Sequence, residues 1–187
     1  MIYKLRESVE KERPRIDFTL PADGTSAYDW ESVNHIITSR LPPSEYRPME
    51  TLTFEVNRVD AEEWDFYPIP GTFGLVSNRV RSCWEEYCFG DIAFLPAVLN
   101  TTNYWIPYAL RMLDCLDHAN SRLTCFKNST KVMSIEKYAF HTERISECRL
   151  FRIPEQRSNL FATGPVCDEM IQADFRGFDF LQVFPQQ

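Results

Sequence analysis

The C-terminal segment constrains the fold most, because it reads as a strand, a helix and a second strand in direct succession. Leu160-Phe161-Ala162 predicts a short strand, and Thr163-Gly164-Pro165 predicts a helix start, since proline suits the first helical turn. Gly177 predicts a left-handed cap, and the alternation over Phe178–Phe184 predicts a closing strand. The helix between them has an apolar stripe: Val166, Met170 and Ile171.

A second helix is predicted in the middle of the chain. Ser77 is a plausible N-cap, because its hydroxyl can accept a hydrogen bond from a first-turn N–H group. Gly90 predicts the end of this helix. Its apolar face recurs at helical spacing: Val80, Trp84 and Tyr87 or Cys88.

The other periodic segments predict strands, two of them with charges at alternate positions as in half-exposed antiparallel pairs. They are Thr51–Val59, Ile92 to Leu95 ending at Pro96, Trp105–Leu116, Lys137–Ile145 and Cys148–Ile153. Frequent prolines make the first fifty residues irregular, apart from a short helix over Asp29–Ser39. We therefore expect an α+β fold, a mostly antiparallel sheet with a few packed helices in a single domain. Residues 1–59 form its irregular N-terminal part, and residues 60–187 form the main α+β domain.

Length and charge limit the functional classes. A chain of 187 residues with 44% hydrophobic side chains can bury a core without disulfides or metals. Its net charge of −7 disfavours binding to nucleic acid or an anionic membrane and favours a basic protein partner. No apolar run is long enough for a membrane span, and the N-terminus lacks a signal-peptide core. We expect a cytoplasmic protein.

The motifs of common enzymes and cofactor sites are missing from the sequence. There is no G-x-S-x-G elbow, no P-loop and no G-x-G-x-x-G fingerprint. The six cysteines form no C-x-x-C pair, so we expect reduced thiols rather than zinc ligands or disulfides. We therefore predict no catalytic residues, no metal and no cofactor. A Cys–His enzyme stays open as an alternative, because such partners can meet only in the fold.

Two polar patches are candidates for binding a partner. The first joins acids to large aromatics over residues 62–67, and the second covers residues 114–118. Aromatic side chains are enriched at binding hot spots, and acidic rims attract basic partners. The alternatives are that Trp64 is a core residue and that Asp117 caps a turn. The predicted binding residues are Glu62, Glu63, Trp64, Asp65, Asp114, Asp117 and His118.

Several segments, taken in order, resemble one known family. A proline- and glycine-rich loop leads into the helix after Ser77, a short strand follows the helix, and a Phe-Arg-Ile-Pro-Glu strand end precedes the closing unit. The matching runs are Asp65–Val80, Gly90–Pro96, Asp114–Asp117 with Ser121, Leu150–Glu155, Leu160–Thr163 and Gly177–Phe180. Over residues 60 to 184 the chain is similar to immunity protein family eleven of the bacterial polymorphic toxin systems. Thr163 and Gly164-Pro165 depart from the family pattern, which has Ser and an acidic pair there.

The resemblance implies a partner rather than a reaction. It implies a protein that binds one cognate bacterial toxin and neutralises it by covering its active site. Two alternatives remain: a small cysteine- or metal-dependent hydrolase that acts as an antidote, and a cytosolic scaffold or regulatory module. The sequence identifies neither the toxin nor the oligomeric state.

Overall fold

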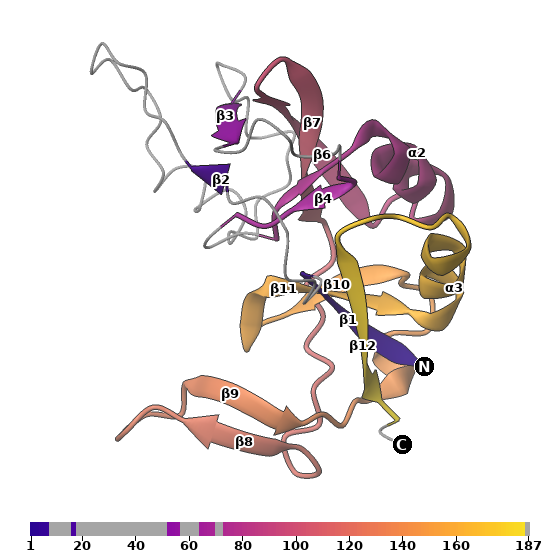
Figure 1. Cartoon of the computed structure of the whole chain (residues 1–187). Helices are drawn as coiled ribbons and strands as arrows, with labels where there is room; N and C mark the ends of the chain where they lie inside the picture. The colour runs from indigo at the N-terminus through magenta and orange to yellow at the C-terminus, as the bar shows by residue number, and fades with distance from the viewer. Residues whose placement is uncertain (8–15, 18–51, 57–63, 70–72, 186–187) are drawn as a thin grey trace.

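The computed structural model describes residues 1–7, 16–17, 52–56, 64–69 and 73–185. This part of the chain is a single-domain α+β fold with two larger sheets, a separate hairpin and two helices (Figure 1). Its elements are β1 (Ile2–Glu7), β2 (Ile16–Asp17), β3 (Leu52–Val56), β4 (Phe66–Tyr67), β5 (Leu75–Val76), α2 (Asn78–Tyr87), β6 (Ile92–Leu99), β7 (Thr102–Ala109), β8 (Arg122–Cys125), β9 (Val132–Lys137), the 3-10 helix η2 (Thr142–Arg144), β10 (Leu150–Ile153), β11 (Gln156–Thr163), α3 (Gly164–Gln172) and β12 (Phe178–Phe184).

The two larger sheets are almost entirely antiparallel, as predicted. One has the order β2-β3-β6-β7-β5-β4, and in it only β3 and β6 run parallel. The other has the order β10-β11-β1-β12. β1 lies between β11 and β12, with Lys4 opposite both Phe161 and Leu181. The first residues of the chain therefore complete the C-terminal sheet, although the sequence predicts an irregular segment there.

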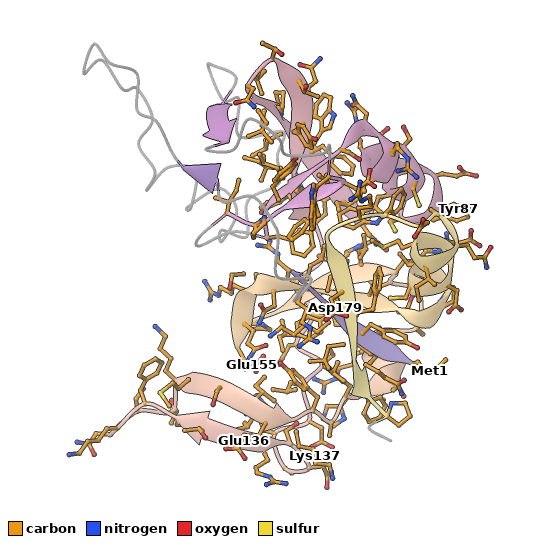
Figure 2. The ribbon with its side chains drawn as sticks, in the orientation of Figure 1. Met1, Tyr87, Glu136, Lys137, Glu155 and Asp179 are labelled. Atoms are coloured by element: carbon orange, nitrogen blue, oxygen red, sulfur yellow. The ribbon has the colours of Figure 1, made fainter. Side chains whose placement is uncertain are left out.

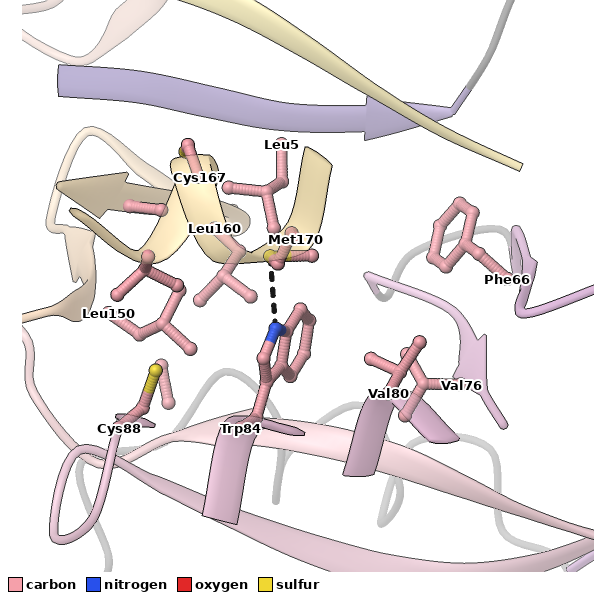
Figure 3. Packing of buried hydrophobic residues seen from close by; sticks show 13 residues of the cluster. Leu5, Phe66, Val76, Val80, Trp84, Cys88, Leu150, Leu160, Cys167 and Met170 are labelled. Atoms are coloured by element: carbon pink, nitrogen blue, oxygen red, sulfur yellow. Dashed lines mark hydrogen bonds between the residues drawn. The ribbon is translucent and has the colours of Figure 1, made fainter. Parts of the chain in front are cut away.

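One core cluster joins both sheets and both helices. Trp84 and Val80 from α2 are fully buried, as the periodicity predicts, and they meet Met170 from α3. The indole Nε1 of Trp84 donates to Met170 Sδ at 3.0 Å, and Figure 3 shows this contact at the centre of the cluster. Leu5 of β1 and Phe66 of β4 belong to the same cluster. Because one core holds residues of both sheets, the described part of the chain behaves as one domain.

The β8–β9 hairpin lies apart from both larger sheets (Figure 1). At its base, Leu123 and Ile135 pack against a core cluster that includes Phe140 and Phe161. Residues 125–131 at its tip are all exposed. The sequence does not predict this hairpin, because two register shifts in the pairing of β8 with β9 interrupt the alternation of side chains.

The helix predictions are confirmed in most details. Ser77 is the N-cap of α2, and its hydroxyl accepts from the N–H of Val80. Pro165 lies in the first turn of α3. One detail of the stripe is wrong, because Ile171 is 58% exposed while Met170 is buried. The predicted helix over Asp29–Ser39 lies outside the described residues.

Gly177 has positive φ, as predicted, but it does not cap α3. The C-cap is Ala173, and Asp174 after it takes the left-handed conformation. Gly177 has φ of 96°, and a Cβ there would lie 2.7 Å from the carbonyl oxygen of Phe66. Glycine is therefore needed because the turn before β12 passes directly over β4.

Three strand predictions need correction at their ends. Strand β6 does not end at Pro96 but continues to Leu99. Proline is tolerated there because the described pairing of β6 with β3 begins only at Ala97, so Pro96 interrupts no hydrogen bond to β3. β7 covers Thr102–Ala109 rather than Trp105–Leu116, and the chain then crosses to the other sheet through a bridge from Met112 to Arg152. The segment predicted over Lys137–Ile145 has only its first residue in β9 and contains η2.

The remaining strand predictions are confirmed where the structure describes them. β11 and β12 cover the segments predicted near the C-terminus, β10 covers 150–153 of the strand predicted over Cys148–Ile153, and β3 covers 52–56 of the strand predicted over Thr51–Val59. Among the described residues, no helix combines the length and the apolar character that spanning a membrane requires.

Candidate functional site

Polar side chains gather where the segment 114–118 passes between the C-terminal sheet and the hairpin. We call this the junction surface, and it consists of Asp114, Asp117, His118, His141, Glu143 and Glu155. His118 Nε2 lies 2.6 Å from Glu155 Oε1, which joins the segment to the β10–β11 turn. Figure 2 places Glu155 between the body of the protein and the hairpin strand that carries Glu136 and Lys137. The junction surface is therefore an acidic rim with three carboxylates that reach solvent, those of Asp114, Asp117 and Glu143, while the Glu155 side chain beneath His118 is only 10% exposed.

Asp117 organises a tight turn at this rim. Its Oδ1 accepts from the backbone N–H groups of Ala119 and Asn120, and its Oδ2 accepts from the Asn120 amide at 2.6 Å. The hydrogen bond from the Asn120 side chain is the largest cause that lowers the pKa of Asp117. Asp117 thus caps a turn, which was the alternative to a binding role, but its exposed carboxylate also stays ionised at neutral pH.

The backbone of the segment is fixed on both sides. Cys115 is buried, and its carbonyl accepts from the N–H of His141 at 2.8 Å. The guanidinium of Arg144 donates to the carbonyl of Asp114 at 2.6 Å, while the Asp114 side chain is exposed. Because the backbone is held in this way, the carboxylates are presented with little conformational freedom left to lose on binding.

The other predicted patch is placed differently. Trp64 and Asp65 are buried, at 9% and 5% exposure, and Glu62 and Glu63 lie outside the described residues. Asp65 accepts from the hydroxyl of Ser77 at 2.6 Å and from Arg79 at 3.0 Å. The structure leaves Asp114 and His118 exposed in one short segment, with Asp117 half-buried between them, and places Trp64 and Asp65 in the interior. These positions favour a core role for Trp64, which the sequence left open.

Glu155 and Glu143 are members of the junction surface that sequence reasoning missed. Glu155 is paired through one oxygen, while its Oε2 is buried without a hydrogen-bond partner. His118 therefore offsets the charge of Glu155 only when its imidazole is protonated. No local pattern marks Glu155, because the β10–β11 pairing brings it to His118, 37 residues away along the chain.

Among the described residues, no cysteine is paired with the histidine that a cysteine hydrolase needs. Burial is the main cause that raises the pKa of Cys115, Cys148 and Cys167 to about 12, and it also raises the pKa of Cys88. All six thiols are free, and no hydrogen bond joins one of them to a histidine in the described part of the chain. The described residues also contain no group of three or more His, Cys, Asp or Glu side chains that could hold a metal ion.

We expect thiol titration at pH 8 to reveal one fast thiol, Cys125, which is exposed on the hairpin. A thiol with a pKa near 12 is ionised to only about one part in ten thousand at that pH, and thiolate is the reactive form. Cys88, Cys115, Cys148 and Cys167 should react at least about 100-fold more slowly. Cys83 should also be slower than Cys125, because burial raises its pKa, and Cys125→Ser should remove the fast phase. A second fast thiol would contradict this.

The same burial makes stability depend on pH. Because unfolded thiols ionise above about pH 9 while the buried ones stay protonated, the free energy of unfolding should fall as the pH rises from 9 towards 12.

The described part of the chain is thus a single-domain α+β protein with an acidic rim beside a projecting hairpin (Figure 1). Comparison with family models gives a match to the immunity protein family (Imm11) over residues 11–184. The chain belongs to this family, which confirms the resemblance seen in the sequence. A search of curated proteins found no match.

Proposed function

We propose that this chain is a non-catalytic bacterial immunity protein that binds one cognate protein toxin in the cytoplasm and neutralises it by covering the active site of the toxin. The observation that carries the proposal is membership of the immunity protein family over residues 11–184. On this proposal the partner is a protein, and neither nucleic acid nor a membrane is bound.

The junction surface supports the proposal as the place of contact. The backbone that carries Asp114 and Asp117 is fixed by Arg144 and His141, and with the exposed Glu143 these carboxylates form an acidic rim. An acidic rim of this kind speeds the encounter with a basic partner and fixes the orientation of docking. Of the predicted binding residues that the structure describes, Asp114, Asp117 and His118 are the ones we retain for this contact.

The test is co-expression of the chain with the toxin domain encoded by the neighbouring gene. The proposal expects restored growth and a stable complex in size-exclusion chromatography. Protection without a complex, together with turnover of the toxin or its product, would favour the hydrolase alternative. The absence of a toxin gene beside this one, with stoichiometric binding to another cytosolic protein, would favour the scaffold alternative.

Reversing one charge on the junction surface should weaken the complex. We expect Asp114→Lys to lower the affinity for the toxin domain at least about tenfold, mainly through slower association at low salt. The matched control is Asp168→Lys, because Asp168 is exposed on α3 and the change in net charge is the same. Equal affinities of the two variants, measured by calorimetry, would remove the junction surface from the interface.

A further inference from the structure

The tip of the β8–β9 hairpin has the opposite charge from the rest of the protein. Residues 125–131 include Lys127 and Lys131 and no acidic side chain, in a chain of net charge −7. The one acid of the hairpin, Glu136, lies nearer the base, where Arg122 approaches it at 3.6 Å and Thr124 donates to it at 3.3 Å. The two tip lysines therefore carry uncompensated positive charge.

The tip and the adjoining end of β9 expose two large apolar side chains, Phe126 and Met133. Phe126 and Met133 are 46% and 54% exposed, and the ammonium of Lys131 lies 5.8 Å from the centre of the Phe126 ring. An exposed aromatic side chain at the end of a projecting element is suited to anchor a partner protein.

The tip is also ordered by its own hydrogen bonds. The N–H of Phe126 donates to the carbonyl of Lys131 at 3.0 Å, and the N–H of Lys131 donates to the Ser129 hydroxyl at 3.0 Å. Asn128 takes the left-handed conformation that closes the loop. A turn held in this way has little conformational entropy left to lose when it docks.

The edges of the hairpin are less suited to docking than its tip. A partner strand would need a regular ladder, but β8 has only four residues and the register between β8 and β9 shifts twice. Side-chain insertion by the tip therefore fits this hairpin better than the addition of a strand to its edge.

We propose that the tip of the hairpin inserts into an acidic cleft of the toxin, with Phe126 as the apolar anchor and Lys127 and Lys131 as its charge partners. This inference rests on the proposed function and adds the chemistry of the partner surface. The acidic junction surface lies at the base of the same hairpin, so the partner surface needs an acidic cleft beside a basic rim. Two patches of opposite sign fix the orientation of docking, because a rotated complex would oppose like charges.

The pocket that the structure describes is a poor site for the tip of a second copy. The structure has a pocket of about 540 Å³ between α2, α3 and the loop before β10, and it is lined by Arg149 as well as by Glu147 and Glu169. A pocket with both signs of charge does not select a cationic tip. We therefore take the toxin as the partner of the tip. Binding of the tip to a second copy is one of the results that the experiment can give.

The experiment measures binding kinetics with the toxin domain encoded by the neighbouring gene, in an inactivated form, at about 50 mM and about 500 mM NaCl. Lys127→Glu should slow association about tenfold at low salt, and the difference should shrink at high salt. Phe126→Ala should speed dissociation about 10- to 100-fold at either salt concentration. Thermal melting should stay unchanged in both variants, because both side chains are exposed.

Two controls make the result specific to the tip. Phe89→Ala removes an equally large side chain that is 92% exposed after α2, and Lys137→Glu makes the same charge change at the base of the hairpin. Both should bind within about twofold of the unaltered protein. If Lys137→Glu slows association as much as Lys127→Glu does, the net charge of the protein sets the association rate, and insertion of the tip is wrong.

The remaining outcomes separate this inference from the proposed function. If the unaltered protein binds and protects, and Phe126→Ala and Lys127→Glu bind equally well, insertion of the tip is overturned while the immunity function stands. If the unaltered protein neither binds nor protects, both fail together. If the protein alone is a dimer and Phe126→Ala makes it a monomer, the tip binds a second copy and the toxin is the wrong occupant.

Discussion

Replacing Trp84 with alanine is expected to lower the free energy of unfolding by about 4 kcal/mol. Trp84 is fully buried in the cluster that joins α2 to α3 (Figure 3). Its ring lies 6.0 Å from that of Phe73 and 6.4 Å from that of Phe94. Alanine would leave a cavity lined by residues from both sheets, and it would also remove the bond to Met170 Sδ. For a chain of this length the midpoint of thermal unfolding should fall by about 10 °C or more.

The measurement is urea unfolding followed by circular dichroism. Trp84→Phe should cost less, about 1–2 kcal/mol, because most of the buried ring is kept. The matched control is Phe89→Ala, which should change stability by less than about 0.5 kcal/mol since Phe89 is almost fully exposed. A loss below about 1 kcal/mol for Trp84→Ala would mean that this cluster does not hold the two helices together.

The parts of the fold that sequence predicts well are governed by local rules. α2 has its hydroxyl cap at Ser77 and an apolar face through Trp84, so its start and its buried side both follow from spacing. α3 begins at the predicted Gly164-Pro165. In each case the residues that decide the structure lie within one or two turns of each other, which is the range where pattern and propensity act.

The parts that sequence misses depend on distant contacts or on broken periodicity. β1 is a strand because β11 and β12, more than 150 residues away, supply partners on both sides. The sequence does not predict the hairpin, because its two register shifts break the pattern in which successive side chains alternate between the faces of a strand. β7 ends at Ala109 because the chain then leaves one sheet for the other, an event that no local pattern marks.

The candidate site was only partly predictable for the same reason. Asp114, Asp117 and His118 stand close together in sequence, so their density is visible there. Glu155 joins them through a hydrogen bond that bridges 37 residues. Asp65 shows the reverse case, because an acid beside aromatics resembles a binding patch in sequence, yet the fold turns it inward.

Replacing Asp65 with alanine should lower the free energy of unfolding by about 3 kcal/mol. Its carboxylate accepts from the hydroxyl of Ser77, from Arg79 and from the N–H of Arg176 at 3.0 Å, so three donors in two segments lose a common acceptor. Ser77 also caps α2, and its hydroxyl would lose the acceptor that orients it. Asp65→Asn should cost about 2 kcal/mol, because an amide N–H group would face these donors. Asp168→Ala, an exposed control, should stay within about 0.5 kcal/mol of the unaltered protein.

The same variants separate a structural acid from an interface acid. Asp65→Asn should keep affinity for the toxin domain within about twofold when it is measured well below the melting temperature, because the carboxylate is 5% exposed and already engaged. Its protection of growth should fall only as the amount of folded protein falls. Asp114→Lys should do the opposite and lose affinity at an unchanged melting temperature. Lost affinity of Asp65→Asn without lost stability would instead place Asp65 in the interface, and the inward orientation would then belong to the unbound protein alone.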